Sequence, residues 1–140
     1  MNLDEWRNFL NEWFRVPDRP GIYILGCYAR YLTLYSQQVR ALNLVAALSE
    51  TGEISDGKRV AVIGAGAAGL TAAVAAAARK AQVIVLEKSE GVMELQRNNR
   101  QRWIHPHIYD WPNAEGKYDY TVLLSWAGAP RTRRMSHRRW

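Results

Sequence analysis

Three glycines at fixed spacing and one acidic residue carry the clearest chemical signal in the sequence. Gly64, Gly66 and Gly69 form the pattern G-x-G-x-x-G, and Glu87 follows 23 residues after the first of them. Glycines at this spacing permit a tight turn and let phosphate groups approach the backbone closely. A carboxylate at that separation can accept hydrogen bonds from the hydroxyls of a ribose. The pattern therefore predicts a site for the diphosphate and ribose of an adenine dinucleotide.

The flanking sequence has the order of elements that this motif requires. Residues 59–63 form a β-branched run that predicts a short buried parallel strand, and residues 82–86 predict a second one that ends at Glu87. Residues 70–79 between them are nearly all alanine, leucine and valine, which predicts a helix lying close to the sheet. Strand, glycine turn, helix and strand make one βαβ unit. The alternative is a small-residue turn and helix that bind no ligand.

Each part of the motif has a physical task in the predicted site. Gly64 permits the turn out of the strand, Gly66 has no β-carbon to obstruct a diphosphate, and Gly69 lets the helix pack against the strand. The unpaired N–H groups at the helix start, which include those of Ala67 and Ala68, face the phosphates with the positive end of the helix dipole. The charge of the acidic residue would repel a 2′-phosphate, which disfavours NADP.

The motif and the second strand resemble the N-terminal ADP-binding segment of FAD-dependent oxidoreductases, in both the glutathione-reductase-like and the amine-oxidase-like groups. Residues 62–73 and 83–88 carry this resemblance. It implies that the three glycines face the pyrophosphate of FAD, that Glu87 holds the ribose, and that Lys88 lies beside the adenosine. In a complete relative, a small-molecule substrate would pass hydride or electrons to the flavin. No residue of this sequence is assigned as a catalyst.

The sequence departs from the family pattern at two places and in its length. Lys80 or Ala81 stands where many members have a glycine before the second strand, and Gly91, Arg97 and Arg100 stand where many have Gly-Gly-Arg. Because the Gly-Gly-Arg pattern is incomplete, flavin contacts beyond the ADP half are not predicted. Because the family usually runs to several hundred residues, the 140-residue chain is interpreted as a truncated or frame-shifted flavoenzyme, inactive without its catalytic half. A genuine small protein is the alternative.

The fold class predicted is α/β: a partial Rossmann-like dinucleotide-binding βαβ unit preceded by two helices. Amphipathic patterns place these helices at residues 4–14 and 27–49. The chain divides into an N-terminal helical segment at 1–54, an incomplete FAD/NAD(P)-binding Rossmann-like domain at 55–130, and a basic disordered tail at 131–140. A sheet of two strands, or of three if residues 118–126 add one, leaves an open edge, which predicts self-association or marginal stability.

Composition excludes several classes of protein. Hydrophobic residues make up 48% of the chain, which excludes wholesale disorder, and no apolar stretch approaches the ~20 residues of a membrane helix. A single cysteine, Cys27, excludes an internal disulfide and a multi-cysteine zinc site, and it favours a reduced, cytoplasmic setting. Most of the net charge of +6 arises in the tail, which contains five arginines and no acidic residue. The rest of the chain has 14 basic and 13 acidic residues and is close to neutral. We therefore expect a solvated tail and no nucleic-acid partner.

The remaining candidates have simpler explanations than chemistry. His105 and His107 flank a proline in a predicted rigid loop, so no metal site is assigned. Arg97, Arg100 and Arg102 could clamp an anion, but a solvated loop is the favoured explanation. Cys27 has no neighbouring cation and is interpreted as a core residue. Two functional alternatives stay open beside FAD: a small NAD-binding protein, and a non-enzymatic module that binds nucleotides or polyanions.

Overall fold

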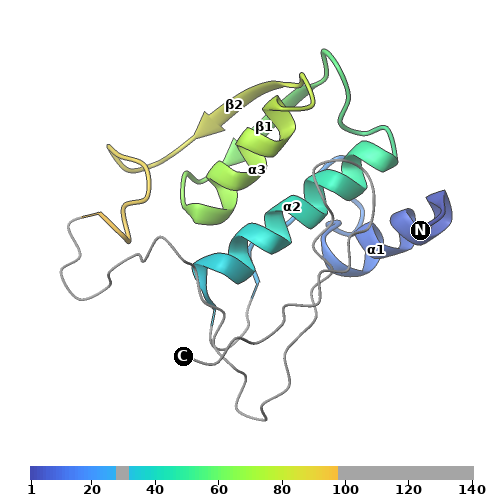
Figure 1. Cartoon of the computed structure of the whole chain (residues 1–140), viewed down its shortest axis with the longest axis horizontal. Coiled ribbons are helices and arrows are strands. Elements are labelled where there is room, and N and C mark those ends of the chain that lie inside the picture. The colour runs from blue at the N-terminus through green and yellow to red at the C-terminus, as the bar shows by residue number, and fades with distance from the viewer. Residues whose placement is uncertain (28–31, 98–140) are drawn as a thin grey trace, which may run out of the picture.

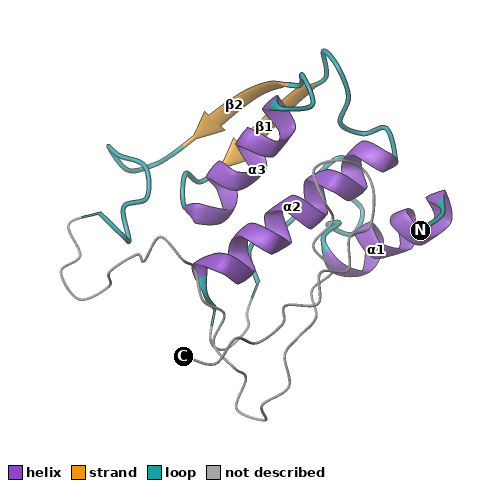
Figure 2. Ribbon diagram, in the orientation of Figure 1, coloured by secondary structure: helices purple, strands orange, loops and turns teal. Residues whose placement is uncertain are grey.

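The computed structural model describes residues 1–27 and 32–97 and has the predicted α/β architecture (Figures 1 and 2). Its elements, in chain order, are α1 (Leu3–Trp13), α2 (Leu34–Glu50), β1 (Arg59–Ile63), α3 (Ala67–Ala77) and β2 (Gln82–Leu86). The predictions for the strand at 118–126, the histidine loop and the tail at 131–140 lie outside the described residues. Within the described part, no helix combines the length and the apolar character needed to cross a bilayer.

β1 and β2 form a parallel pair, in register from Arg59 beside Gln82 to Ile63 beside Leu86. α3 connects them and lies between the sheet and α2 (Figure 1). Both strands have the predicted bounds, which confirms the βαβ unit. A sheet face of two strands is therefore covered by one helix, and this helix is covered in turn by a second.

The prediction that both strands are buried is wrong for one face of the sheet. Val60, Val62 and Val83 are partly buried beneath α3. On the opposite face, Ile63 is 86% exposed, and Ile84 and Leu86 are each at least half exposed. A β-branched run indicates a strand but not how many layers cover it, and in the described part of the chain only α3 packs on this sheet.

α3 begins three residues before the predicted start because the last residues of the glycine motif already form its first turn. Its buried positions are occupied by glycine and alanine, which allows close approach to both the sheet and α2; they are Gly69, Ala72, Ala73, Ala75 and Ala76. The helix ends with Ala78 as its C-cap, and Lys80 follows with φ +61°, in the left-handed region. Lysine thus adopts a backbone conformation that glycine favours.

α2 begins at Leu34, later than the predicted start at residue 27, because Thr33 and Ser36 form a capping box. The Ser36 N–H donates to Thr33 Oγ1 over 2.9 Å, and the Thr33 N–H donates to Ser36 Oγ over 3.1 Å. The predicted stop is confirmed, since Thr51 is the C-cap and Gly52 has φ +76°. α2 packs against both α1 and α3, so its buried set is broader than a single stripe: Val39, Ala41, Leu44, Val45, Ala47 and Leu48.

α1 is held to α2 by its C-terminal end. Trp6, Leu10 and Phe14 are buried as predicted, whereas Leu3 and Trp13 of the same predicted stripe are about half exposed. Arg40 of α2 places its guanidinium 4.2 Å from the centre of the Phe14 ring and donates from Nη2 to the Trp13 carbonyl oxygen over 2.8 Å. A cation–π contact and a charged hydrogen bond therefore fix the end of α1.

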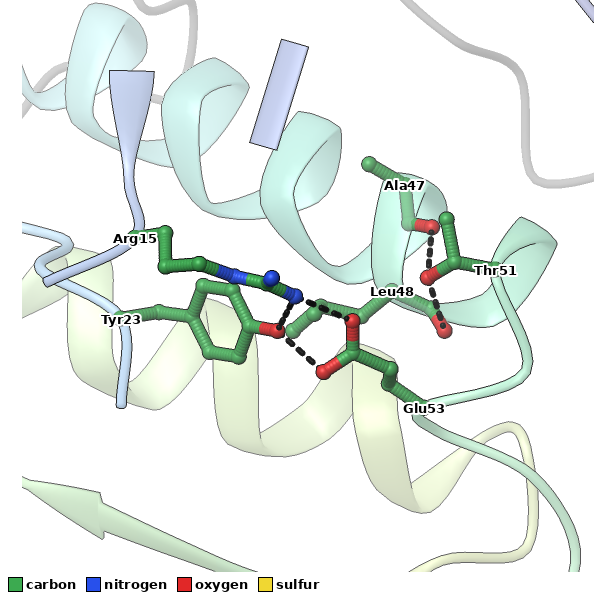
Figure 3. A network of polar contacts seen from close by, with 6 residues as sticks. All are labelled: Arg15, Tyr23, Ala47, Leu48, Thr51 and Glu53. Atoms are coloured by element: carbon green, nitrogen blue, oxygen red, sulfur yellow. Dashed lines mark hydrogen bonds and ion pairs between the residues drawn. The ribbon is translucent and has the colours of Figure 1, made fainter. Parts of the chain in front are cut away.

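A three-residue polar network joins the segment after α1 to the segment after α2 (Figure 3). Arg15 donates from Nη2 to Glu53 Oε1 over 2.9 Å and to the Tyr23 oxygen over 3.0 Å, and the Tyr23 hydroxyl donates to Glu53 Oε2. Burial, followed by the hydrogen bond to Glu53, raises the pKa of Tyr23 above its usual value. The network therefore fastens the N-terminal segment to the layer of α2.

Candidate functional site

The glycine turn begins at the end of β1, where the parallel pairing with β2 stops. The N–H of Gly64 donates to the carbonyl oxygen of Leu86 over 2.7 Å, one position beyond the last paired residues of the sheet. Gly64 has φ +98°, in the region that residues with a β-carbon rarely adopt. The chain therefore reverses out of β1 at the position where the sequence supplies a glycine.

The last glycine of the motif is in tight contact with the first. A β-carbon placed on Gly69 would overlap the carbonyl oxygen of Gly64 and would lie 3.4 Å from Val62 Cγ1. Gly69 is buried within the first turn of α3. The absence of a side chain here lets the start of α3 pack against the end of β1, which is the packing task expected of this residue.

The middle glycine faces open space at the helix start. Gly66 is the N-cap of α3, is exposed, and has no side chain to cap the helix. A β-carbon on it would meet nothing within 4 Å among the described residues. The first bond of the helix joins the Leu70 N–H to the Gly66 carbonyl oxygen over 2.9 Å. Within residues 1–27 and 32–97, no acceptor is bonded to the N–H groups of Ala67 and Ala68, so they are available to an anion.

Glu87 lies against the glycine turn, where the sequence predicts it. Its Oε2 accepts a hydrogen bond from the Ala65 N–H over 2.6 Å, and its Oε1 accepts one from the Ser89 N–H over 2.9 Å. These bonds, with that from Ala65 the stronger cause, lower the pKa of Glu87. A carboxylate has about four acceptor positions, so capacity for hydroxyl donors is left on both oxygens.

The segment that follows β2 folds back onto the turn. The Met93 N–H donates to the Ala65 carbonyl oxygen over 2.9 Å, and the N–H groups of Gln96 and Arg97 come within bonding distance of the Met93 carbonyl. Lys88, predicted to lie beside an adenosine, is exposed at the start of this segment. Ala65 and Met93 were not predicted from the sequence, because both act through backbone groups that leave no side-chain signal.

Among the described residues, neither Cys27 nor the Arg97 side chain is bonded to the glycine turn or to Glu87. Cys27 is partly buried, with its Sγ 3.8 Å from Gln37 Nε2. Arg97 lies close to Gly91, where its guanidinium would overlap an added β-carbon. Arg100, Arg102 and both histidines of the predicted loop lie outside the described residues. In the described ranges, no group of three or more histidine, cysteine or acidic side chains could hold a metal ion.

Comparisons with known proteins place the motif in a family. A family model described as FAD dependent oxidoreductase matches residues 59–139, which is more than half of the chain and begins at the first residue of β1. Searches of the curated proteins and of the solved structures return no significant match. The matched region contains the glycine turn, α3, β2 and Glu87.

Proposed function

The chain belongs to the FAD-dependent oxidoreductase family, and we propose on this premise that its glycine turn and Glu87 bind the ADP half of FAD. The observation that carries the proposal is the position of Glu87. Its carboxylate is held 2.6 Å from the Ala65 nitrogen, beside the helix start that has no side-chain cap. Acceptors for ribose hydroxyls and donors for a diphosphate therefore lie on neighbouring parts of one turn.

The residues present fit the ADP half of the cofactor. Gly66 leaves open the space that a β-carbon would fill, and the N–H groups of Ala67 and Ala68 at the positive end of the helix dipole suit a diphosphate. Like an ordinary carboxyl, Glu87 is ionised at neutral pH, and its hydrogen bonds favour this form, so it can accept from a ribose and repel a 2′-phosphate. Lys88 is placed beside the adenosine in this proposal, since it directly follows the ribose-binding residue.

FAD, when bound, would supply the chemistry of the family by accepting hydride or electrons from a small-molecule substrate. The described residues bind and orient the dinucleotide and exclude a 2′-phosphate. None of them is assigned as a catalyst. The family identification favours FAD over the alternative of NAD, and the alternative of a polyanion-binding module depends on a tail outside the described residues.

The proposal is tested by titrating the full chain with FAD and following the visible spectrum and the quenching of flavin fluorescence. We expect wild-type protein to retain FAD through gel filtration. Gly66→Ala places a methyl group where the diphosphate would lie, so its dissociation constant for FAD should rise by about tenfold or more.

The matched control is Gly26→Ala, because Gly26 is also exposed and also has nothing within 4 Å of an added β-carbon. This variant should bind FAD as the wild type does. Equal FAD binding by Gly66→Ala and Gly26→Ala would contradict the proposed position of the diphosphate. Binding of NADH without binding of FAD would instead support the NAD alternative.

A further inference from the structure

Glu87 is in contact with the protein's own glycine turn, which gives it a task besides holding a ribose. We propose that Glu87 is a positioning residue, which orients the phosphate-binding amides by accepting the hydrogen bond of the Ala65 N–H. This inference rests on the proposed function of the turn. It differs from it in predicting that a ligand without any ribose depends on Glu87.

The peptide groups on both sides of Ala65 are fixed by bonds to the chain after β2. The Ala65 N–H donates to Glu87 Oε2 over 2.6 Å, and the Ala65 carbonyl oxygen accepts from the Met93 N–H over 2.9 Å. Ala65 itself is 1% exposed, so its peptide groups are not free to turn to solvent. The turn is thus held from both sides at this one residue.

The orientation of Ala65 determines that of the next amide. In a trans peptide the carbonyl oxygen and the following N–H point in opposite directions, and no described peptide bond is cis. Because the Ala65 carbonyl points to Met93, the Gly66 N–H points away from the segment after β2. Holding Ala65 therefore directs the Gly66 amide, and α3 starts at the next residue.

Removing Glu87 has two opposite effects on anion binding, and two variants separate them. Loss of the charge favours an anion at the turn, because a carboxylate repels phosphate. Loss of the acceptor removes the part-buried hydrogen bond that fixes the Ala65 N–H, so at Ala65 the turn is then held only by the bond to Met93. Glu87→Gln removes only the charge, since the glutamine oxygen can still accept from Ala65, whereas Glu87→Ala removes both.

The probe is inorganic diphosphate, which has no ribose, titrated calorimetrically into the full chain. We expect Glu87→Gln to bind it at least as tightly as the wild type, and Glu87→Ala to bind it at least about threefold more weakly than Glu87→Gln, a difference of about 0.7 kcal/mol. If Glu87 acted only through ribose contact and charge, the two variants would bind diphosphate equally, and that result would overturn the proposal.

A second measurement needs no ligand. Amide hydrogen exchange, followed by NMR on the apo protein, should show Ala65 protected in the wild type and in Glu87→Gln and unprotected in Glu87→Ala, while the α3 amides stay protected in all three. Unchanged protection of Ala65 in Glu87→Ala would overturn the positioning role. A wild-type chain that binds no FAD would contradict the proposed function, whereas the exchange comparison would still decide the role of Glu87.

Discussion

Gly69 and Gly64 are in such close contact that a β-carbon on Gly69 would overlap the carbonyl oxygen of Gly64. The two residues belong to different elements, because Gly64 follows β1 and Gly69 lies in the first turn of α3. Their contact sets how near the helix start lies to the strand end. The position of the amides that we propose to bind phosphate therefore depends on a residue that need not touch the ligand.

Gly69→Ala should destabilise the fold by about 1–2 kcal/mol. Overpacking at a tight contact costs about 1–3 kcal/mol, and the better helix propensity of alanine offsets up to about 1 kcal/mol of it. Urea denaturation followed by circular dichroism measures the change. Gly66→Ala is the control in the same motif, because open space surrounds Gly66 and replacing it costs at most about 1 kcal/mol of capping. A Gly69→Ala variant as stable as wild type would contradict the contact.

Tyr23→Phe should lower the free energy of unfolding by about 1 kcal/mol, because the hydroxyl both accepts from Arg15 and donates to Glu53 in a partly buried network. FAD binding should not change, since the bonds of the network join Arg15, Tyr23 and Glu53 to one another and not to the glycine turn or Glu87. Asp56→Asn is the control: its ion pair with Lys80 is 3.8 Å long and more than three-quarters exposed, so the effect should stay below about 0.5 kcal/mol. Equal effects of the two variants in urea denaturation would show that the network adds no stability.

Stability should depend on pH through Glu87. Hydrogen bonds from the N–H groups of Ala65 and Ser89 lower the pKa of this carboxyl in the folded chain below its ordinary value of 4.5. The folded state therefore binds its proton less readily than the unfolded state, so the contribution to stability is present above pH 4.5 and is lost as the pH falls through the lower, folded value. Wild type should lose more stability than Glu87→Gln between pH 7 and pH 3 in urea denaturation. The same loss in both proteins would contradict the shift.

The chemistry of the glycine motif made the local geometry of the candidate site predictable from sequence. Gly64 requires a left-handed turn, Gly69 a close contact, and Glu87 follows a strand that must run parallel to the first. These demands are local and leave a side-chain signature. The backbone contacts of Ala65 and Met93 were not predictable, because any residue type can make them.

Elsewhere the sequence was less informative, for reasons that differ between elements. Helical periodicity continues upstream of Thr33, so the pattern alone did not show that a capping box with Ser36 starts α2 there. The runs that form β1 and β2 are apolar on both faces, which is typical of strands buried on both sides. The described structure covers only one face, and nothing local to a strand reports whether a second layer exists.

The uncovered face of the sheet predicts reversible self-association. Ile63, Ile84 and Leu86 form an apolar row on it, and β1 and β2 each have an unpaired edge within the described part of the chain. Sedimentation velocity over a range of concentrations should show association that Ile84→Lys weakens, because the new charge would have to be desolvated in the contact. Val74→Lys is the matched control, since Val74 is similarly exposed but lies on α3, away from this face. Equal behaviour of the two variants would exclude the sheet face as the contact, because an added lysine would then act only through net charge.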